Sequence, residues 1–578
     1  MSSPINPSKR IFVQGFVAGS VVMGLSKYIP SAWARTRRDM NLQMPVLEGK
    51  YFELTIFESL VNFTGVERIA TTINGSIPAP TLKFKEGDAV TIKVVNQLKE
   101  STSIHWHGLI LPYQMDGVPG VSFSGIPAGE SFTYKFMIQQ SGTYWYHSHS
   151  GMQEMTGMYG AIIIEPKEKE LFEYDRDHVV VLSDWTDEEP NSVFNKLKMQ
   201  GDFYNFNQPT TISTINQVSE LGLATTYANK KMWNEMRMSP SDLADLSSKT
   251  LTYLLNGNVP NMGWTGLFHK GERVRLRFIN AAGNTFYDVR IPGIKMTVVQ
   301  SDGLNIKPVM VDEFRFGPGE TYDVLVEPTK DANTIFAQAM DRTGYASGTL
   351  ATMYGLKATI PDLDEPESLS MVDMMGDMGH SKMGISSIEA SLHGRNIHDL
   401  MGKPSQQVRH ANTEYGPSVD MRVDTPRVSL DDPGVGLRKT CRKVLTLSDL
   451  KSLIKIDNLH PPERELELHL TGNMKRYTWS FDGVEFGEST PIHLKYGERV
   501  RIILHNDTMM THPMHLHGMW SELESSDGEL LVRRHTIPVQ PAQRISFLVT
   551  ADALGAWAWH CHLLFHMDAG MFRKVVVS

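Results

Sequence analysis

Residues 559–571 read WHCHLLFHMDAGM, and the rest of the chain is organised around this stretch. It contains a cysteine with a histidine on each side, then a third histidine and a methionine at intervals of five residues. The residues are His560, Cys561, His562, His566 and Met571. Two imidazoles, a thiolate and a weak axial thioether are the ligands of a blue copper electron-transfer site. A buried cysteine among ordinary core histidines does not explain this spacing, so the stretch predicts a metal centre.

Alternation along a β-strand predicts a second metal centre behind the first. Successive side chains on a strand point to opposite faces. If Cys561 points at one copper, His560 and His562 therefore point the other way. Cys561 and its two covalent neighbours would then connect the two centres as a path for electrons.

Length, charge and cysteine content limit the number of domains, the partners and the disulfides that the chain can have. The 578 residues are enough for roughly three or four domains of ordinary size. A net charge of -9 argues against nucleic acid as a partner, because phosphate binding needs a basic patch. The two cysteines are Cys441 and Cys561. If Cys561 binds copper, an intramolecular disulfide is excluded and Cys441 is a lone thiol.

The N-terminus has the pattern of an export signal over residues 1–34. A basic SKRIF segment at 8–12 opens an apolar, glycine-containing run, and AWA at 32–34 is an A-x-A cleavage site. The pattern resembles a twin-arginine signal with Lys9 in place of the first arginine, so Sec export stays open as well. An N-terminal membrane anchor is the alternative, although the run is short for a membrane span.

Three segments of the chain share one pattern, a turn glycine and an alternating strand that ends nine residues later in Asn. They are FKEGDAVTIKVVN at 84–96, FHKGERVRLRFIN at 268–280 and LKYGERVRIILHN at 494–506. A second repeat, PAGE at 127–130, PGE at 318–320 and PAQ at 541–543, again leads into alternating strands. Short strands separated by turn signals predict an all-β protein of three β-sandwich domains with one ancestry.

The three repeats differ in their histidines. HWHG begins nine residues past Asn96, and HPMHLHG follows Asn506, whereas the second repeat has FYDV at 286–289. Domains one and three are therefore predicted to carry the chemistry, with domain two as a spacer. Four His-x-His pairs result, His105/His107, His147/His149, His515/His517 and His560/His562. On a strand this spacing puts both imidazoles on one face, and eight imidazoles can serve three coppers. His512 remains to complete the blue site.

Two stretches break the β pattern. Residues 190–250 are polar and partly helical in pattern, and we interpret them as an insertion in domain two. Residues 361–440 are rich in Asp, Ser, Gly and Pro and predict a long linker or insertion before domain three. The predicted domains are 45–168, 169–360 and 441–578.

A methionine-rich tract, MVDMMGDMGHSKM, occupies residues 371–383. No apolar periodicity surrounds its methionines, so burial does not account for them, and thioethers select Cu(I). We interpret the tract as a Cu(I) recruitment site, the alternative being a low-complexity linker. Its ligands would be Met371, Met374, Met375, Met378, His380 and Met383. Met152, Met155 and Met158 repeat every three residues, which fits one packed face of a helical turn.

The sequence resembles the multicopper oxidases over residues 45–578. Four motifs carry the resemblance, HWHG at 105–108, HSH at 147–149, HPMHLHG at 512–518 and HCHLLFHMDAGM at 560–571. TEYGPSVDMRVDTP at 413–426 and the methionine-rich insertion are similar to the copper resistance protein A family of bacterial periplasmic oxidases. The resemblance implies three cupredoxin-like Greek-key sandwiches with a Met-rich insertion between domains two and three. It also implies a periplasmic location, and we expect a monomer.

The resemblance implies four coppers, assigned motif by motif. The type 1 ligands would be His512, Cys561, His566 and Met571. The type 2 ligands would be His105 and His515. The type 3 pair would be held by His107, His147, His149, His517, His560 and His562.

Reduction of O2 to two waters requires four electrons, the number that four one-electron coppers can store. Protons must also arrive, so an acid near the cluster is expected. Asp116, nine residues past His107, resembles the acid found there in related oxidases, although Asp116-Gly117 is also an ordinary turn signal. Some relatives carry a second acid directly after the second type 1 histidine, where this chain has Met567.

The leading prediction is an oxidase that converts Cu(I) to Cu(II) with O2 in copper resistance, alongside other periplasmic copper-handling proteins. A laccase-like oxidase of phenols is the second interpretation, and a copper-sequestering protein is the third. Sequestration needs neither the Cys561 connection nor eight clustered histidines. A copper nitrite reductase is excluded, because it would need only a type 1 and a single type 2 site. The loops around His512 and His566 would decide between Cu(I) and phenols.

Overall fold

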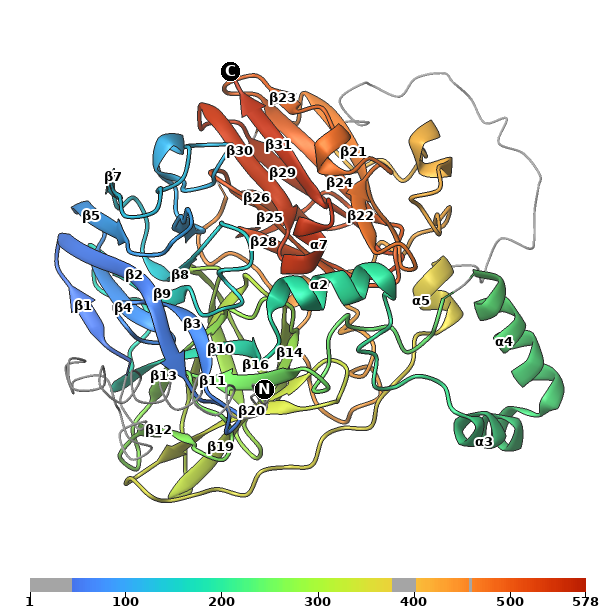
Figure 1. Ribbon diagram of the computed structural model, residues 1–578, viewed down its shortest axis with the longest axis horizontal. Coiled ribbons are helices and arrows are strands. Elements are labelled where there is room, and N and C mark those ends of the chain that lie inside the picture. The colour runs from blue at the N-terminus through green and yellow to red at the C-terminus, as the bar shows by residue number, and fades with distance from the viewer. Residues whose placement is uncertain (1–43, 237, 377–401, 457–459) are drawn as a thin grey trace, which may run out of the picture. The chain divides into compact units, whose positions relative to one another are not determined.

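Six β-sheets, two in each of three sandwiches, contain the named strands of the described chain (Figure 1). The structure is a computed structural model that describes residues 44–236, 238–376, 402–456 and 460–578. The prediction of three cupredoxin-like sandwiches is confirmed. The predicted signal peptide, residues 1–34, lies outside the described residues.

The first sandwich has one sheet in the order β1-β4-β9-β8-β6 and a second in the order β3-β2-β5-β7. Its strands are β1 (Val46–Glu48), β2 (Tyr51–Val61), β3 (Arg68–Ile73), β4 (Ala79–Lys85), β5 (Ala89–Asn96), β6 (His105–His107), β7 (Ser131–Met137), β8 (Gly142–His147) and β9 (Tyr159–Glu165). Val90, Ile92 and Val94 are buried on one face of β5, as their alternation predicts. The short helix η1 (Tyr113–Met115) follows β6.

The second sandwich has sheets in the orders β11-β10-β13-β18-β15-β16 and β12-β20-β19-β14-β17. Its strands are β10 (Arg176–Thr186), β11 (Leu251–Leu255), β12 (Trp264–Leu267), β13 (Val274–Asn280), β14 (Tyr287–Arg290), β15 (Met296–Ser301), β16 (Leu304–Val311), β17 (Glu313–Phe316), β18 (Thr321–Val326), β19 (Ala332–Ala339) and β20 (Tyr345–Ala351). Three helices, α2 (Pro190–Met199), α3 (Thr211–Leu221) and α4 (Leu223–Met236), lie between β10 and β11.

The third sandwich has sheets in the orders β22-β21-β24-β29-β26-β27 and β23-β31-β30-β25-β28. Its strands are β21 (Arg464–Asn473), β22 (Thr478–Phe481), β23 (Ile492–Leu494), β24 (Arg499–Asn506), β25 (His512–Leu516), β26 (Ser521–Glu524), β27 (Leu530–Arg534), β28 (Thr536–Val539), β29 (Arg544–Thr550), β30 (Gly555–Cys561) and β31 (Phe572–Val577). Helix α7 (Leu564–Asp568) lies between β30 and β31, and the short helices η3 (Leu447–Asp449) and η4 (Phe486–Glu488) lie in connections.

The three repeated strands, β5, β13 and β24, occupy equivalent places in their sandwiches. Each lies between a parallel neighbour and an antiparallel neighbour in its sheet. The Asn at the end of each strand donates from Nδ2 to the carbonyl of Ile126, Phe316 or Val539, at 2.9, 3.0 and 2.9 Å. These carbonyls lie just before the second repeat, so the Asn side chain joins the two repeated segments and satisfies a buried backbone group.

The connection from 361 to 440 contains two short helices in its described part, α5 (Met371–Met375) and η2 (Asn412–Tyr415). Our interpretation that burial does not account for the tract methionines is wrong for Met374, which is 0% exposed. Met371 and Met375 also pack against the core. A five-residue helix is too short to show a helical period in the sequence. Met378, His380 and Met383 lie outside the described residues.

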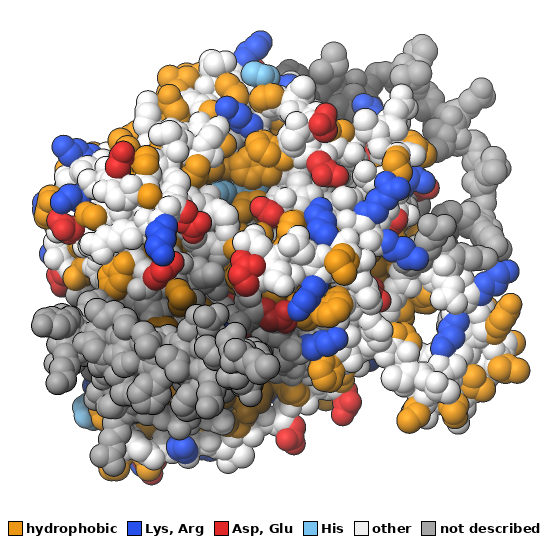
Figure 2. Space-filling view, in the orientation of Figure 1, with side chains coloured by type: hydrophobic (Ala, Val, Ile, Leu, Met, Phe, Trp, Pro, Cys, Tyr) orange, Lys and Arg blue, Asp and Glu red, His pale blue; other side chains and the backbone are white. Residues whose placement is uncertain are grey.

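The structure also bears on three methionines, the two cysteines and the surface of the protein. Met152, Met155 and Met158 are buried, but not in a helix: the first two lie in turns and Met158 directly precedes β9. Cys441 is exposed and Cys561 is buried, and both thiols are free. Among the described helices, none is long and apolar enough to cross a membrane. On the face shown in Figure 2, basic and acidic side chains are interspersed.

Candidate metal centres

The C-terminal stretch brings His512, Cys561 and His566 together. We call these three residues and Met571, the predicted axial ligand, the blue copper group. Cys561 ends β30, His566 lies on α7, and His512 begins β25. Cys561 Sγ lies 3.5 Å from His512 Nδ1 and 3.8 Å from His566 Nδ1, and the two nitrogens are 3.1 Å apart. Met571 is fully buried, and its carbonyl accepts the backbone N–H of Cys561 at 3.1 Å.

The outer nitrogens of the two imidazoles in this group have their own partners. Thr508 Oγ1 lies 2.7 Å from His512 Nε2, and Asp245 Oδ2 lies 2.8 Å from His566 Nε2. Each ring therefore presents Nδ1 to Cys561, an arrangement typical of metal-bound histidines with fixed outer contacts. Burial raises the pKa of the Cys561 thiol, so a thiolate at this place requires a cation beside it.

The eight histidines of the four His-x-His pairs form one histidine cluster between the first and third sandwiches. In the sheet registers, His105 of β6 pairs with His147 of β8, and His515 of β25 pairs with His560 of β30. Strand pairing within each sandwich thus joins two motifs that lie far apart in the sequence. The sequence predicted this convergence, and the structure brings the eight side chains into three neighbouring groups, two of which share His107.

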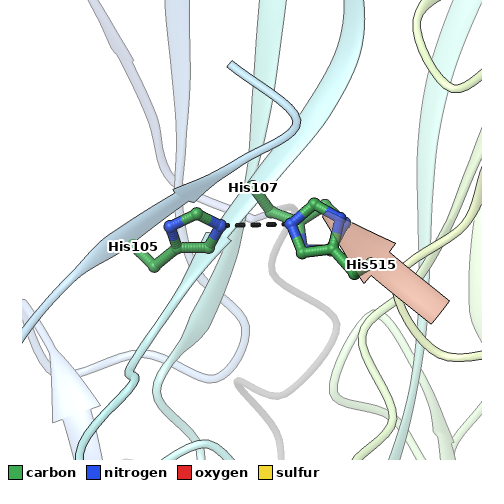
Figure 3. A group of neighbouring side chains, drawn as sticks. All are labelled: His105, His107 and His515. Carbon is green, nitrogen blue, oxygen red and sulfur yellow. Dashed lines mark hydrogen bonds between the residues drawn. The ribbon is translucent and has the colours of Figure 1, made fainter. Parts of the chain in front are cut away.

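His105 and His515 face one another across the two sandwiches (Figure 3). Nδ1 of His105 donates to the carbonyl of Asp116 at 2.8 Å, and Nδ1 of His515 donates to the carbonyl of His535 at 2.7 Å. The two Nε2 atoms are therefore unprotonated, and they lie 3.4 Å apart. Two facing lone pairs repel each other unless a cation lies with them, so this pair fits a metal ion.

His149, His517 and His560 form a second group with the same chemistry. Nε2 of His560 lies 3.1 Å from Nε2 of His517 and 3.3 Å from Nε2 of His149. Nδ1 of His517 donates to Asp116 Oδ2 at 2.9 Å, and Nδ1 of His560 donates to the carbonyl of Cys561 at 2.9 Å. The lone pairs at Nε2 therefore converge on one point.

His107, His147 and His562 form a third group. Nδ1 of His107 and Nε2 of the other two are buried, and they have no hydrogen-bond partner within the described chain. The remaining nitrogen of His147 lies 2.8 Å from Glu154 Oε2, and that of His107 lies 3.2 Å from Thr536 Oγ1. Buried inner nitrogens without a partner, beside outer nitrogens with fixed contacts, fit a set of metal ligands.

Burial disfavours the charged form of eight of these imidazoles. It lowers the pKa of His560 to about 3, with further lowering from neighbouring histidines. It also lowers the pKa well below the usual value for His107, His147, His149, His512, His515, His517 and His562. The neutral imidazole is the form that binds a metal ion, so the donor set fits copper at neutral pH.

Asp116 lies both in a tight turn and against the histidine cluster. Its carboxylate is buried, with Oδ2 2.9 Å from His517 Nδ1 and Oδ1 3.4 Å from His105 Nδ1. The next residue, Gly117, has φ +83, and a Cβ there would lie 1.8 Å from the carbonyl oxygen of Ile104. The turn therefore aims the acid at the cluster.

Two acids beside the metal groups were missed in the sequence. Glu154 contacts His147, and burial raises its pKa well above the usual value. Its only sequence signal is its position five residues after His149. Asp245 contacts His566 from the insertion in domain two, more than 300 residues before that histidine, and no local motif surrounds it.

The prediction that domain two is only a spacer is wrong. Asp245 reaches the blue copper group from this domain. Asp302 and Glu320 also pair with Arg534 of the third sandwich, at 2.7 and 2.5 Å, directly before His535. Domain two therefore contributes carboxylates, but no histidines, to the surroundings of the blue copper group and of the histidine cluster.

Family comparison agrees with this geometry. Multicopper oxidase family models match residues 56–169, 176–354 and 459–578. The chain is a multicopper oxidase, an O2-reducing enzyme, and its groups match the type 1, type 2 and type 3 copper sites of that class.

Full-length relatives narrow the class. Copper resistance protein A of Escherichia coli is 51% identical over 608 residues, which cover 99% of this chain and 100% of the relative. A copper resistance protein A homolog of Pseudomonas syringae pv. tomato is 52% identical over 592 residues, with 100% of both chains covered. This chain belongs to the copper resistance protein A family. The solved laccase from Botrytis aclada shares the fold, with a TM-score of 0.60, 20% identity, and 92% and 88% of the two chains covered.

Proposed function

We propose that this oxidase uses Cu(I) as its reducing substrate and converts it to Cu(II) in the periplasm. The observation that carries the proposal is the identity of about half of all residues, over the whole length, with a protein named for copper resistance. The thioethers at Met378 and Met383, with His380, add soft ligands that select Cu(I). Other periplasmic copper-handling proteins are the expected partners. Each metal group is complete within one chain, which supports a monomer.

We assign the copper ligands by group. The type 1 ligands are His512, Cys561, His566 and Met571; the type 2 ligands are His105 and His515; the type 3 ligands are His107, His147, His149, His517, His560 and His562. When bound, four coppers supply the four one-electron steps that reduction of O2 to two waters requires.

The tripeptide at 560–562 connects the assigned groups. Cys561 belongs to the blue copper group, whereas His560 and His562 belong to two different groups of the histidine cluster. Covalent bonds alone therefore join the type 1 group, which the substrate would reduce, to the histidine cluster, where O2 would bind. Burial of all three side chains keeps water away from this path.

Asp116 is proposed to relay protons to the cluster. Its carboxylate accepts a hydrogen bond from His517 Nδ1 and can take up and release a proton at Oδ1 or Oδ2. Asp116→Asn keeps the shape but cannot carry the proton, so the variant should bind copper and accept electrons normally but reoxidise slowly in O2. Unchanged reoxidation in stopped-flow absorption would leave Asp116 with a turn-forming role only.

The substrate proposal is tested by kinetics with Cu(I) and with a phenol on the same copper-loaded enzyme. We expect kcat/KM to be at least about tenfold higher for Cu(I). A higher value for the phenol would favour the laccase-like alternative.

The role of the methionine tract is tested separately. Because Met374 is buried, deletion of the whole tract would damage the core. Substituting Met378, His380 and Met383 by Ser spares α5 and should weaken Cu(I) oxidation at low free copper while phenol oxidation stays the same. A parallel fall in both activities would assign these residues a structural role, and no change in either would make the tract a linker.

A further inference from the structure

A cluster of ligand-type side chains lies in the third sandwich and shares no residue with the copper groups. We call it the His410 cluster, composed of His410, Glu414, His469 and Asp507. One ligand atom from each residue lies within 4.8 Å of the others. His410 and Glu414 belong to the connection around η2, His469 lies on β21, and Asp507 directly follows β24. Two strands of one sheet and a separate connection thus meet at one point.

The four ligand atoms are close and convergent. His410 Nδ1 lies 2.6 Å from Glu414 Oε2 and 3.6 Å from Asp507 Oδ2. His469 Nδ1 lies 2.7 Å from the same Asp507 oxygen and 3.4 Å from the same Glu414 oxygen. Both imidazoles therefore turn Nδ1 inward toward one pair of carboxylates. All four side chains are at most 7% exposed.

The outer nitrogens of both histidines face further carboxylates. His410 Nε2 lies 3.3 Å from Asp424 Oδ1, and His469 Nε2 lies 3.5 Å from Glu467 Oε1. A histidine held between a metal ion and an outer carboxylate is the usual arrangement at protein metal sites, because the carboxylate fixes the ring and raises its basicity. Here both outer carboxylates lie at ion-pair distance and not in a hydrogen bond, since neither Nε2 has a hydrogen-bond partner among the described residues.

A fifth side chain, His505, gives an independent sign that the cluster is a ligand site. His505 is 0% exposed, and neither of its ring nitrogens has a hydrogen-bond partner among the described residues. It is the register partner of His469 on the neighbouring strand, with the ring centroids 4.6 Å apart, and its Nε2 lies 3.6 Å from Asp507 Oδ1. The other two repeats have Val95 and Ile279 at this position. Burying an unpartnered imidazole there has a free-energy cost without a packing reason.

Charge and ligand type define the ion that would fit. Two carboxylates match the charge of a divalent cation, and two neutral imidazoles complete a four-ligand nitrogen and oxygen set. Such a set binds Zn²⁺ or Cu²⁺ and, lacking sulfur, does not select Cu(I). The rival account is a buried ion-pair network. Burial would lower the pKa of His469, but the neighbouring carboxylates of Asp507 and Glu467 raise it to about 10, so a metal ion at this site must displace a proton from the ring.

We propose that His410, Glu414, His469 and Asp507 form a fifth metal site, which takes a divalent ion of the Zn²⁺ or Cu²⁺ type. Bound there, the ion would fasten the connection around η2 to strands β21 and β24. The site is separate from the four oxidase coppers, so its occupancy should not alter the blue absorption.

The test uses the full chain already loaded with four coppers. The protein is incubated with Zn²⁺, or in a second arm with Cu²⁺, then desalted, and its metal content is measured. We expect one further ion per chain. His410→Gln and Glu414→Gln should each weaken its binding at least about tenfold and leave the blue absorption unchanged. His493→Gln, an exposed histidine on β23 of the same sandwich, is the matched control and should retain the ion.

Two results would overturn the site. Wild-type protein that gains no ion in either arm contains an ion-pair network instead, and a further ion that both variants retain is bound elsewhere. If either variant fails to fold, X-ray absorption at the zinc edge of the zinc-loaded wild type identifies the ligands of the further ion. Imidazole and carboxylate ligands support the proposal, whereas a sulfur ligand or an absence of imidazole contradicts it.

Discussion

Asp245 shows how a single residue from an insertion can tune a distant metal group. Its Oδ2 lies 2.8 Å from His566 Nε2 and accepts the Tyr477 hydroxyl at the same distance. The carboxylate is buried, so its charge acts on the blue copper group with little screening by water. A negative charge at this place stabilises the oxidised form of a bound copper.

Asp245→Asn should therefore raise the reduction potential of the type 1 copper by tens of millivolts while the copper content stays the same. Redox titration of the blue absorption measures this shift. Asp527→Asn, at a carboxylate that is 79% exposed, is the control and should leave the potential unchanged. A lower potential in Asp245→Asn would contradict this electrostatic role.

The residues of the metal groups could be predicted where the spacing within a motif determines which way the side chains point. The i, i+2 histidines and Cys561 were found because a strand places alternate side chains on one face. Asp245, Glu154 and the His410 cluster were not found, because they depend on contacts between segments far apart in the sequence. Asp116 was singled out by its resemblance to an acid at the same place in related oxidases, and the structure shows that its carboxylate contacts His517.

At the scale of elements, the turn after η1 decides whether Asp116 reaches the histidine cluster. Gly117 has φ +83, and a Cβ at this residue would meet the Ile104 carbonyl at 1.8 Å. Gly120 has a similar φ of +75 but open space around its Cβ direction. An alanine at either position would have the same backbone strain, but only an alanine at Gly117 would also clash with a neighbouring atom.

Gly117→Ala should be clearly more destabilising than Gly120→Ala. Both changes cost about 1 kcal/mol for a left-handed backbone, but only the first also displaces the turn. Thermal unfolding measures the stability difference, and metal analysis should show copper loss in Gly117→Ala alone. Equal losses of stability in the two variants would mean that the clash is relieved without moving Asp116.

The elements themselves were predictable to different degrees. The repeated strands were predicted because an alternating pattern between a turn glycine and an Asn appears three times. Helix α5 was not predicted, because five residues carry too little periodicity, and the burial of Met374 comes from packing against distant parts of the core.

At the scale of the whole molecule, a buried ion cluster joins the second and third sandwiches. Arg534 is 0% exposed and pairs with Asp302 and Glu320. Although burial raises the pKa of Asp302, the guanidinium holds it below its usual value. The next residues, His535 and Thr536, both donate backbone N–H groups to Asp302 Oδ2 at 3.1 Å, so the cluster also positions residues that contact His107.

Arg534→Met should destabilise the protein by about 3–5 kcal/mol, because it leaves two buried carboxylates without a counterion. Lys403→Met, which removes one partner of the exposed pair with Asp527, should cost about 1 kcal/mol or less. Unfolding in denaturant compares the two variants. Equal effects would show that the buried cluster contributes no more than a surface ion pair.

The central claim is that one chain holds a blue copper joined through Cys561 to a three-copper cluster. Copper analysis with absorption spectroscopy of wild type and Cys561→Ser tests it most directly. We predict four coppers per chain and a blue absorption band in the wild type, and three coppers with no blue band in the variant. Two or fewer coppers after full loading of the wild type, or a variant that remains blue, would contradict the claim.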